Sequence, residues 1–389
     1  MLDRCVRPEI LKRLASYPAV AVVGPRQCGK TTLAQSLGGI YFDLEQEPER
    51  LRADLEWDQL TVGKDLVVFD EAQSWPEVFT RLRAAIDRDR KRNGRFLLLG
   101  SVSPSLMIEV SESLAGRLAL AELTPLLRTE LETDSSRQRL WLCGGYPDGG
   151  VLEPRSYPQW QLNYLSLLSQ RDLPTWGLPS KPQTTDRLLR MLAALHGQIW
   201  NASQVGQSLG LSYQTVNSYM DYLEGAFLIR RLPPYQVNIR KRLVKSPRIY
   251  WRDTGLLHAL LNVSDERALL AQPWVGASWE GFVIQQAIGE LLCRGLNFSA
   301  YYFRTSDQYE LDLVIDAGTE LWAIEIKLTS SPSPADLAQL NKVADMIGAA
   351  RRFLVTRTSK PAGDAYRASC NLPFLIEKLQ QASGRHIRR

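Results

Sequence analysis

Residues 19–38 read "AVAVVGPRQCGKTTLAQSLG" and decide the fold of the N-terminal part of the chain. The first five residues are all apolar, as expected of a strand buried on both faces of a parallel sheet. The pattern G-x-x-x-x-G-K-[ST] follows at residues 24–31 and leads into a helical segment. Glycines let the backbone N–H groups of such a loop wrap a phosphate, and the helix N-terminus adds positive partial charge. The segment therefore predicts an α/β fold with a phosphate-binding loop.

The residues of this loop have separate expected roles in binding ATP and Mg²⁺. We expect Lys30 to bridge the β- and γ-phosphates and the Thr31 hydroxyl to bind Mg²⁺. The expected nucleotide contacts are Gly24, Pro25, Arg26, Gln27, Cys28, Gly29, Lys30, Thr31 and Thr32. The alternative is a strand, turn and helix with a chance Lys–Thr pair, and the match at every required position favours nucleotide binding.

Two acidic residues end the apolar run of residues 65–73, "DLVVFDEAQ". At the end of a neighbouring strand, Asp70 can hold Mg²⁺ through water, and Glu71 can orient and deprotonate an attacking water. Because a lone Asp suffices for binding, the Asp–Glu pair favours hydrolysis of ATP. The alternative is that the two acids only cap a strand.

Two further residues at the ends of predicted strands are candidates for the site: Ser101 follows one strand and Arg117 precedes another. The run "GRFLLLGSVSP" (94–104) ends in Ser101, which we expect to hydrogen-bond the attacking water or the γ-phosphate. Ser103 is the alternative residue for this role, and a helix N-cap is the alternative role. Arg117 closes "SESLAGR" and can reach the γ-phosphate of a neighbouring subunit, or form a surface ion pair. The first case implies a homo-oligomer or a partner protein.

Composition and charge are typical of a globular intracellular protein. The 389 residues are 44% hydrophobic and 23% charged, and the net charge of +5 permits contact with nucleic acid without indicating it. Five scattered cysteines form no CxxC pair, which argues against zinc sites and disulfides. No apolar run has membrane-spanning length, and the N-terminus lacks a signal-peptide core. We therefore expect a cytoplasmic protein with no membrane partner.

The pattern of apolar runs and breaks predicts several domains. Short apolar runs alternate with helical segments up to residue 123, which is typical of an open parallel sheet. Clusters of Pro and Gly, "CGGYPDGG" and "LPTWGLPSKP", indicate a boundary near residue 180. We predict an ATPase domain at 1–135, a helical connector at 136–185, three helices followed by a β-ribbon at 186–252 and a second α/β domain at 253–389.

The module at 186–252 contains a helix–turn–helix pattern. Ser203 is expected to cap a helix over 204–209, Gly210 to end it, and Ser212 to cap the next helix over 213–224. This segment resembles a winged helix-turn-helix. Eight cations follow without an intervening acid, which predicts contact with the phosphates of double-stranded DNA: Arg230, Arg231, Arg240, Lys241, Arg242, Lys245, Arg248 and Arg252. The alternative is a protein-docking module.

Residues 310–327, "ELDLVIDAGTELWAIEIK", form a predicted hairpin with acids at alternating positions. With the preceding helix, it resembles the restriction-endonuclease-like, or PD-(D/E)XK, fold. The resemblance implies a metal site of Glu280, Asp312 and Glu325 with Lys327 beside it, whose chemistry would be cleavage of DNA. Leu311 stands where that family often has Pro. The alternative is an exposed hairpin with cross-strand ion pairs.

The N-terminal motifs together resemble a family of predicted AAA+-type ATPases of bacteria and archaea. The resemblance rests on "GPRQCGKTTL", "YFDLE", "VVFDEAQ", "LLLGSVSPSL", "SESLAGR" and "ELTPL". It implies an ATPase followed by a C-terminal region of unknown function, although Val102 interrupts the Ser-rich strand end of the family. Two other hypotheses stay open: a metal-dependent DNA nuclease gated by ATP, and a regulatory or defence scaffold that uses nucleotide as a switch without turnover.

Overall fold

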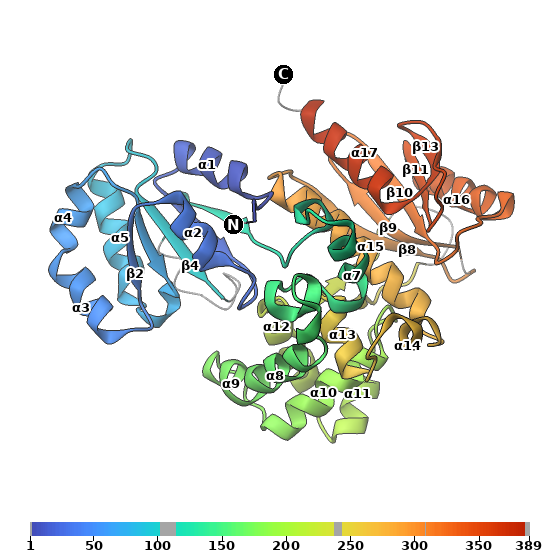
Figure 1. Ribbon diagram of the computed structural model, residues 1–389, viewed down its shortest axis with the longest axis horizontal. Helices are drawn as coiled ribbons and strands as arrows, with labels where there is room; N and C mark the ends of the chain where they lie inside the picture. The colour runs from blue at the N-terminus through green and yellow to red at the C-terminus, as the bar shows by residue number, and fades with distance from the viewer. Residues whose placement is uncertain (1, 102–113, 237–242, 308, 386–389) are drawn as a thin grey trace. The chain divides into compact units, whose positions relative to one another are not determined.

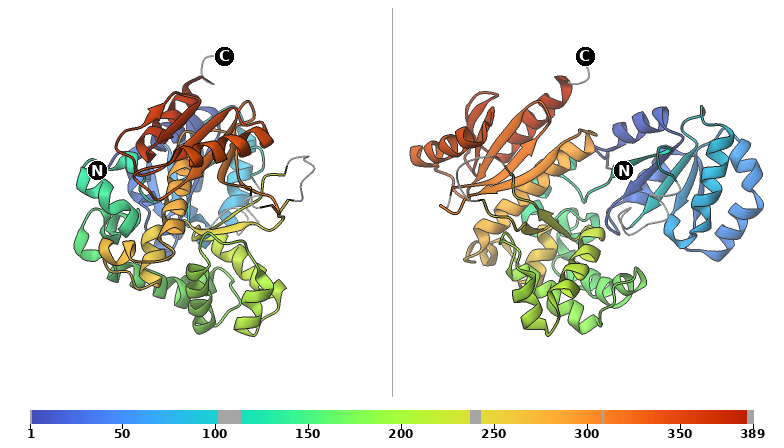
Figure 2. Two further views of the ribbon diagram at one scale, coloured as in Figure 1. Left: turned by 90° about the vertical axis from the view of Figure 1, so that its right-hand side faces the viewer. Right: turned by 180° about the vertical axis from the view of Figure 1, so that it is seen from behind.

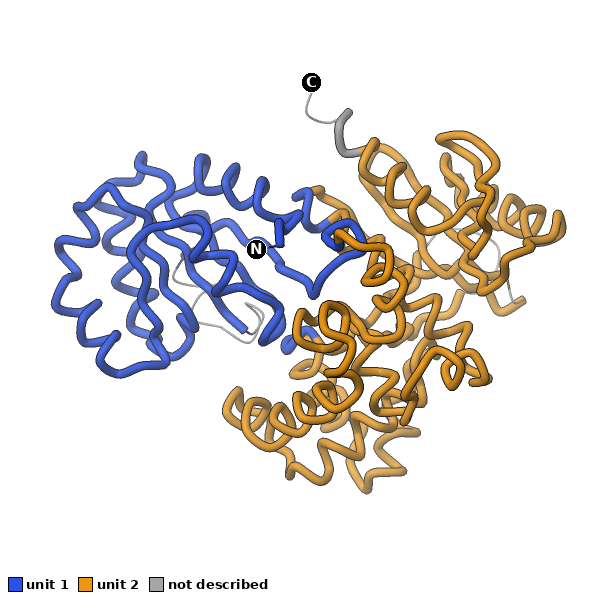
Figure 3. Tube along the Cα trace, viewed as in Figure 1, with its two compact units in different colours: residues 1–131, 225–227, 292–295 blue, residues 132–224, 228–291, 296–389 orange. Residues whose placement is uncertain are grey.

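The computed structural model describes residues 2–101, 114–236, 243–307 and 309–385. The chain forms two compact units, shown in Figure 3. Unit 1 comprises residues 1–131 with 225–227 and 292–295, and unit 2 comprises residues 132–224, 228–291 and 296–389. The described residues contain no helix long and apolar enough to cross a lipid bilayer.

Unit 1 is built on a five-stranded sheet in the order β2-β3-β4-β1-β5, in which all neighbours are parallel. The strands are β1 (Ala19–Val23), β2 (Ile40–Asp43), β3 (Val67–Asp70), β4 (Phe96–Gly100) and β5 (Leu118–Glu122). The helices are α1 (Arg7–Ser16), α2 (Lys30–Leu37), α3 (Glu47–Leu55), α4 (Trp57–Val62) and α5 (Glu77–Arg88), with 3₁₀ turns at Ala72–Ser74 and Arg128–Glu130. The predicted open parallel sheet is confirmed.

Helices cover both faces of this sheet (Figure 1). Successive side chains of a strand point to opposite faces, so Ala19 and Ala21 of β1 join one apolar layer while Val20 and Val22 join the other. The first layer packs under α3, α4 and α5, and the second under α1 and α2. A sheet buried on both faces requires apolar residues at every strand position, which explains the unbroken apolar run of residues 19–23.

Unit 2 begins with helices that pack around a later helix. These are α7 (Asp134–Cys143), α8 (Gln159–Leu167), α9 (Leu173–Thr175) and α10 (Pro182–Ala194), with short 3₁₀ or π turns at Pro147–Val151, Pro154–Ser156 and Leu168–Asp172. Helix α13 (Thr254–Leu260) contacts α7 and α8. Its N-cap Asp253 accepts hydrogen bonds from the N–H groups of Leu256 (3.0 Å) and Gly145 (2.7 Å). One buried carboxylate thus joins α13 to the chain that follows α7.

A pair of helices and a ribbon follow, in the predicted order. They are α11 (Ala202–Leu209), α12 (Tyr213–Gly225), β6 (Ile229–Leu232) and the antiparallel β7 (Arg248–Trp251). Ser212 caps α12 as predicted, because its Oγ accepts the Thr215 N–H. The predicted cap Ser203 is wrong: Asn201 caps α11 through the Gln204 N–H, and the helix begins two residues earlier than expected.

The C-terminal part of unit 2 contains a six-stranded mixed sheet, orange to red in Figure 2. Its order is β12-β13-β11-β10-β9-β8, with β8 (Ser299–Arg304), β9 (Glu310–Asp316), β10 (Leu321–Ile326), β11 (Arg351–Val355), β12 (Ala362–Gly363) and β13 (Arg367–Cys370). The helices are α14 (Glu266–Leu270), α15 (Val275–Cys293), α16 (Pro334–Ile347) and α17 (Leu372–Arg385). The predicted hairpin is β9–β10, and α16 makes the crossover to the parallel neighbour β11.

Replacement of Phe69 by alanine should lower the free energy of unfolding of unit 1 by about 3–5 kcal/mol, because it removes a buried ring and leaves a cavity. Phe69 is fully buried, and its ring stacks on those of Phe42 (5.7 Å) and Phe96 (6.4 Å). Leu55→Ala is the control: its side chain is 77% exposed, and the expected change is within about 0.5 kcal/mol. Urea unfolding measures both, and equal effects would contradict the packing.

Candidate active site

The candidate site lies at one edge of the unit 1 sheet. Gly24 follows β1, Asp70 ends β3 and Ser101 follows β4. Since the three strands are parallel neighbours, their carboxyl ends meet at the same edge, which is where ligands bind in open α/β sheets. The Gly24 N–H donates to the Gly100 carbonyl across 3.3 Å, which attaches the start of the loop to the end of β4.

Backbone geometry requires glycine at two positions of the loop. A Cβ on Gly24 would lie 2.2 Å from the carbonyl oxygen of Leu123, a contact that no side chain tolerates. Gly29 has φ +97°, in the left-handed region that favours glycine. Lys30 begins α2, is buried, and its Nζ donates to the carbonyls of Gly24 (3.0 Å) and Pro25 (2.9 Å). The amine therefore lies over the loop that the sequence predicts to hold phosphates.

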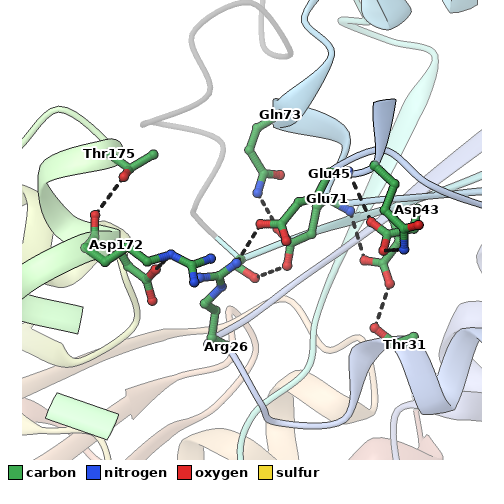
Figure 4. A network of polar contacts seen from close by, with 12 residues as sticks. Arg26, Thr31, Asp43, Glu45, Glu71, Gln73, Asp172 and Thr175 are labelled. Atoms are coloured by element: carbon green, nitrogen blue, oxygen red, sulfur yellow. Dashed lines mark hydrogen bonds and ion pairs between the residues drawn. The ribbon is translucent and has the colours of Figure 1, made fainter. Parts of the chain in front are cut away.

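The predicted pair Thr31 and Asp70 is brought together. Thr31 Oγ1 donates a hydrogen bond to Asp70 Oδ2 across 2.6 Å. Figure 4 labels Thr31 and marks this bond by a dashed line. Tyr41, on β2, donates its hydroxyl to the same oxygen across 2.7 Å, and the Glu71 N–H donates to Oδ1. Burial and the neighbouring Asp70 raise the pKa of Tyr41, so its hydroxyl keeps the proton that it donates. Neutral donors thus orient Asp70 without cancelling its charge.

Glu71 is held by two side chains. Ser101 Oγ donates to Glu71 Oε1 across 2.6 Å, and Gln73 Nε2 donates to Glu71 Oε2 (Figure 4). The backbone of Glu71 has φ +48°, a strained conformation for a residue with a side chain. Of the two predicted serines, Ser101 is buried in this network, and Ser103 lies outside the described residues. A strained backbone conformation persists only where the surrounding structure holds it, and such residues are concentrated at functional sites.

The other predicted loop residues have varied surroundings. Arg26 Nη2 forms an ion pair with Glu45 Oε1 at 2.6 Å, whereas Gln27 and Thr32 are exposed. Cys28 is fully buried, and burial raises the pKa of its thiol, so the side chain remains a neutral thiol. Because Arg26 is paired and Cys28 is a buried neutral thiol, we expect the backbone N–H groups of the loop, Lys30 and Thr31 to make the main polar contacts to a phosphate.

Arg117 lies in an ion pair within unit 1. Its Nε and Nη2 donate to the two carboxylate oxygens of Asp87 on α5, at 2.8 and 2.9 Å. The hydrogen bonds from Arg117 lower the pKa of Asp87. Of the two roles expected for Arg117, the ion pair is the one found within this chain, and a role toward a neighbouring subunit stays a prediction.

A buried ion pair of Arg4 and Glu130 holds the phosphate-binding loop, and the sequence did not predict this pair. The buried Arg4 guanidinium donates to the carbonyl oxygens of Cys28 (2.7 Å) and Thr124 (2.6 Å) and to Glu130 Oε1 (2.9 Å). Glu130 also accepts the N–H groups of Cys5 and Leu127, each at 2.8 Å. Because the two residues lie 126 positions apart, no local sequence pattern could have indicated the pair.

The predicted carboxylates of unit 2 lie on adjacent elements, Glu280 on α15, Asp312 on β9 and Glu325 on β10. Burial raises the pKa of all three, and the neighbouring carboxylates add to the increase. Lys327 instead pairs with Asp336 of α16 at 2.5 Å. In the described part of the chain, no group of three or more His, Cys, Asp or Glu side chains has the arrangement to hold a metal ion.

Two of the eight cations predicted to contact DNA phosphates are paired with acids of the chain. Arg231 forms ion pairs with Asp221 and Glu224 of α12, and Arg248 is buried against acids of α15 and β9. Lys245 is exposed, whereas residues 240–242 lie outside the described residues. Acids of α12, α15 and β9 therefore neutralise part of the predicted basic surface.

Comparisons with known proteins agree with this geometry. Residues 16–132 match the model of an AAA domain, residues 135–267 match a domain of unknown function (DUF8612), and residues 275–373 match another (DUF4143). The parallel sheet, the loop and this match define unit 1 as a P-loop domain of the AAA type, a class of domain that binds ATP.

The chain is 40% identical over 327 residues to the uncharacterized protein Rv2008c of Mycobacterium tuberculosis, and equally to Mb2031c of Mycobacterium bovis. These alignments cover 83% of this chain and 73% of each relative. The chain belongs to the family of these proteins. Among solved structures, the Walker-type ATPase PABY2304 of Pyrococcus abyssi is similar with a TM-score of 0.46 and 14% identity, over 67% of this chain and 96% of that one.

Arg4→Met should weaken ATP binding about tenfold, because the Cys28 carbonyl loses its buried donor and the loop loosens. Combining it with Glu130→Gln removes the charge that would otherwise be left unpaired. The control is Arg13→Met on α1, where the arginine pairs with Glu9 on the same helix. Calorimetric titration with ATP and Mg²⁺ measures the affinity of each protein. Equal affinities for the wild type, Arg4→Met and Arg13→Met would contradict the role of Arg4 in supporting the loop.

Proposed function

We propose that unit 1 hydrolyses ATP to ADP and phosphate with Mg²⁺. The observation that carries this proposal is the pair of contacts at the sheet edge, Thr31 to Asp70 and Ser101 to Glu71, each 2.6 Å long. Thr31 and Asp70 present a hydroxyl and a carboxylate, the hard oxygen donors that Mg²⁺ prefers. When bound, the ion neutralises charge on the β- and γ-phosphates.

The chain's own residues then perform the reaction. The loop N–H groups and the Lys30 amine hold the phosphates in place of the carbonyls that the amine now contacts. Glu71 accepts a proton from water as the water oxygen bonds to the γ-phosphorus and the bond from phosphorus to the ADP oxygen breaks. Ser101 orients the Glu71 carboxylate through its 2.6 Å hydrogen bond.

Glu71→Gln should keep the affinity for ATP and slow turnover about 100-fold to 1,000-fold, because an amide cannot accept the proton. Lys30→Ala should weaken binding itself. Glu77→Gln is the control, since Glu77 is exposed in the first turn of α5. Phosphate release and calorimetric binding, measured on the same preparations, separate the two effects. Unchanged phosphate release in Glu71→Gln or in Lys30→Ala would contradict the assignment.

We further propose a domain division of 1–135, 136–185, 186–252 and 253–389, with a winged helix in the third part that contacts double-stranded DNA. Helices α10, α11 and α12 with the β6–β7 ribbon support this module. On α12, Tyr213, Gln214 and Ser218 are exposed, as a DNA-reading face requires, while Asn217 accepts a hydrogen bond from Trp200. Docking of a partner protein on the same face is the competing proposal.

Gln214→Glu should weaken DNA binding about tenfold, because it places a negative charge next to phosphates. Gln339→Glu makes the same chemical change at an exposed position on α16 and should leave the affinity unchanged. Fluorescence anisotropy of a labelled duplex at fixed salt measures both. Duplex binding that is equal in the two variants would exclude α12 as the DNA-contacting helix and favour protein docking.

The second candidate function is cleavage of DNA by the C-terminal domain, which we propose to have a restriction-endonuclease-like fold. It is favoured by the electrostatic coupling of Glu280, Asp312 and Glu325, and it requires a change in their arrangement, because within the described residues they do not form a metal site. A nucleotide switch that acts without turnover is the remaining alternative to the ATPase.

An oligomer in which Arg117 reaches a neighbouring subunit would first have to break the ion pair of Arg117 with Asp87.

A further inference from the structure

Arg248, the first residue of β7, is held by carboxylates from two other elements of unit 2. Its Nη1 lies 3.1 Å from Glu280 Oε1 and 3.6 Å from Asp312 Oδ1, and its Nη2 contacts Glu310 Oε1. The side chain is only 8% exposed, and its guanidinium also lies over the ring of Tyr302. A full positive charge therefore lies beside Glu280 and Asp312, two of the acids for which the sequence resemblance implies a metal site.

The surrounding groups complete this arrangement. Tyr250, on the same strand, donates its hydroxyl to Glu280 Oε1, and the Ile326 N–H donates to Asp312 Oδ2. Arg304 contacts the outer oxygen of Glu310 at 3.5 Å. Glu280 Oε1 therefore has two donors, Tyr250 and Arg248, whereas Asp312 faces the guanidinium with Oδ1 and the Ile326 N–H with Oδ2. Glu325 differs, because its Oε2 is buried without a hydrogen-bond partner among the described residues.

A buried carboxylate is stabilised by taking up a proton or by a neighbouring cation, and in this cluster the cation can be Arg248 or a divalent ion. A divalent ion would need direct contact with oxygens of Glu280 and Asp312, and the guanidinium already lies against both. The two cations therefore compete for the same oxygens. Arg248 is fixed in this position, because β7 pairs with β6 over four residues and Arg248 itself bridges to Ile199. The residues present therefore do not fit a bound metal ion while β7 is in place.

We propose that Arg248 is the resident cation of this cluster and that it closes a latent divalent-cation site in the C-terminal domain. With β7 in place, the carboxylates are neutralised from within the chain and bind neither Mg²⁺ nor Mn²⁺. Loss of the guanidinium leaves the oxygens of Glu280 and Asp312 without this cation, and carboxylate oxygens are the hard ligands that a divalent ion prefers. This inference does not depend on hydrolysis of ATP by unit 1.

The test is to count bound Mn²⁺ by electron paramagnetic resonance in nucleotide-free protein. Arg248→Met should bind one Mn²⁺ per chain at this cluster, at least about tenfold more tightly than the wild-type cluster. Arg248→Met with Asp312→Asn should lose that ion, which separates it from any ion at Asp70. Arg304→Met, which removes a neighbouring arginine that contacts Glu310 alone among these acids, is the matched control and should gain no ion.

A melting measurement covers the case in which the Arg248→Met protein is unstable, and two outcomes would overturn the proposal. If Arg248→Met is too unstable to titrate, Mn²⁺ should raise its melting temperature and leave that of the wild type and of Arg248→Lys unchanged. Mn²⁺ binding by the wild type that is lost in Asp312→Asn would overturn the proposal, since the site would then be open. Absence of any added Mn²⁺ effect in Arg248→Met, in both titration and melting, would overturn it as well.

Discussion

The parallel pairing of β3 with β4 and of β4 with β1 is the constraint on which the unit 1 site depends. It brings the ends of three strands to one edge, so that residues from distant parts of the chain meet around one loop. The register also pairs Asp43 with Asp70, which leaves Tyr41 of β2 near enough to bond the Asp70 carboxylate. A different strand order would separate the loop, Asp70 and Ser101, although each local motif would be unchanged.

The two units deal with buried acids in opposite ways. Around Asp70 the donors are hydroxyls and a backbone N–H, which fix the carboxylate but leave its negative charge for a cation. Around Glu280 and Asp312 the donor is a guanidinium, which supplies the balancing charge itself. Since a cation binds where negative charge is oriented and not yet neutralised, we expect Mg²⁺ at Asp70 and no divalent ion at the cluster of unit 2.

The sequence predicts features that arise within short segments. The loop, the strand-end acids and the β9–β10 hairpin all follow from local pattern, and the structure contains each of them. Contacts over long sequence separations could not be predicted, because no pattern records that Arg4 reaches Glu130 or that Arg248 reaches Glu280. The wrong cap at Ser203 has a different cause, since Asn201 is an equally good cap two residues earlier.

Release of phosphate from excess ATP by the wild-type protein tests the central claim most directly. The arrangement of Thr31, Asp70, Glu71 and Ser101 predicts many phosphates released per chain in the presence of Mg²⁺, and none when the ion is chelated. A chain that binds ATP with Mg²⁺ and releases no phosphate would contradict the assignment of Glu71 as the base and leave a nucleotide switch as the function of unit 1.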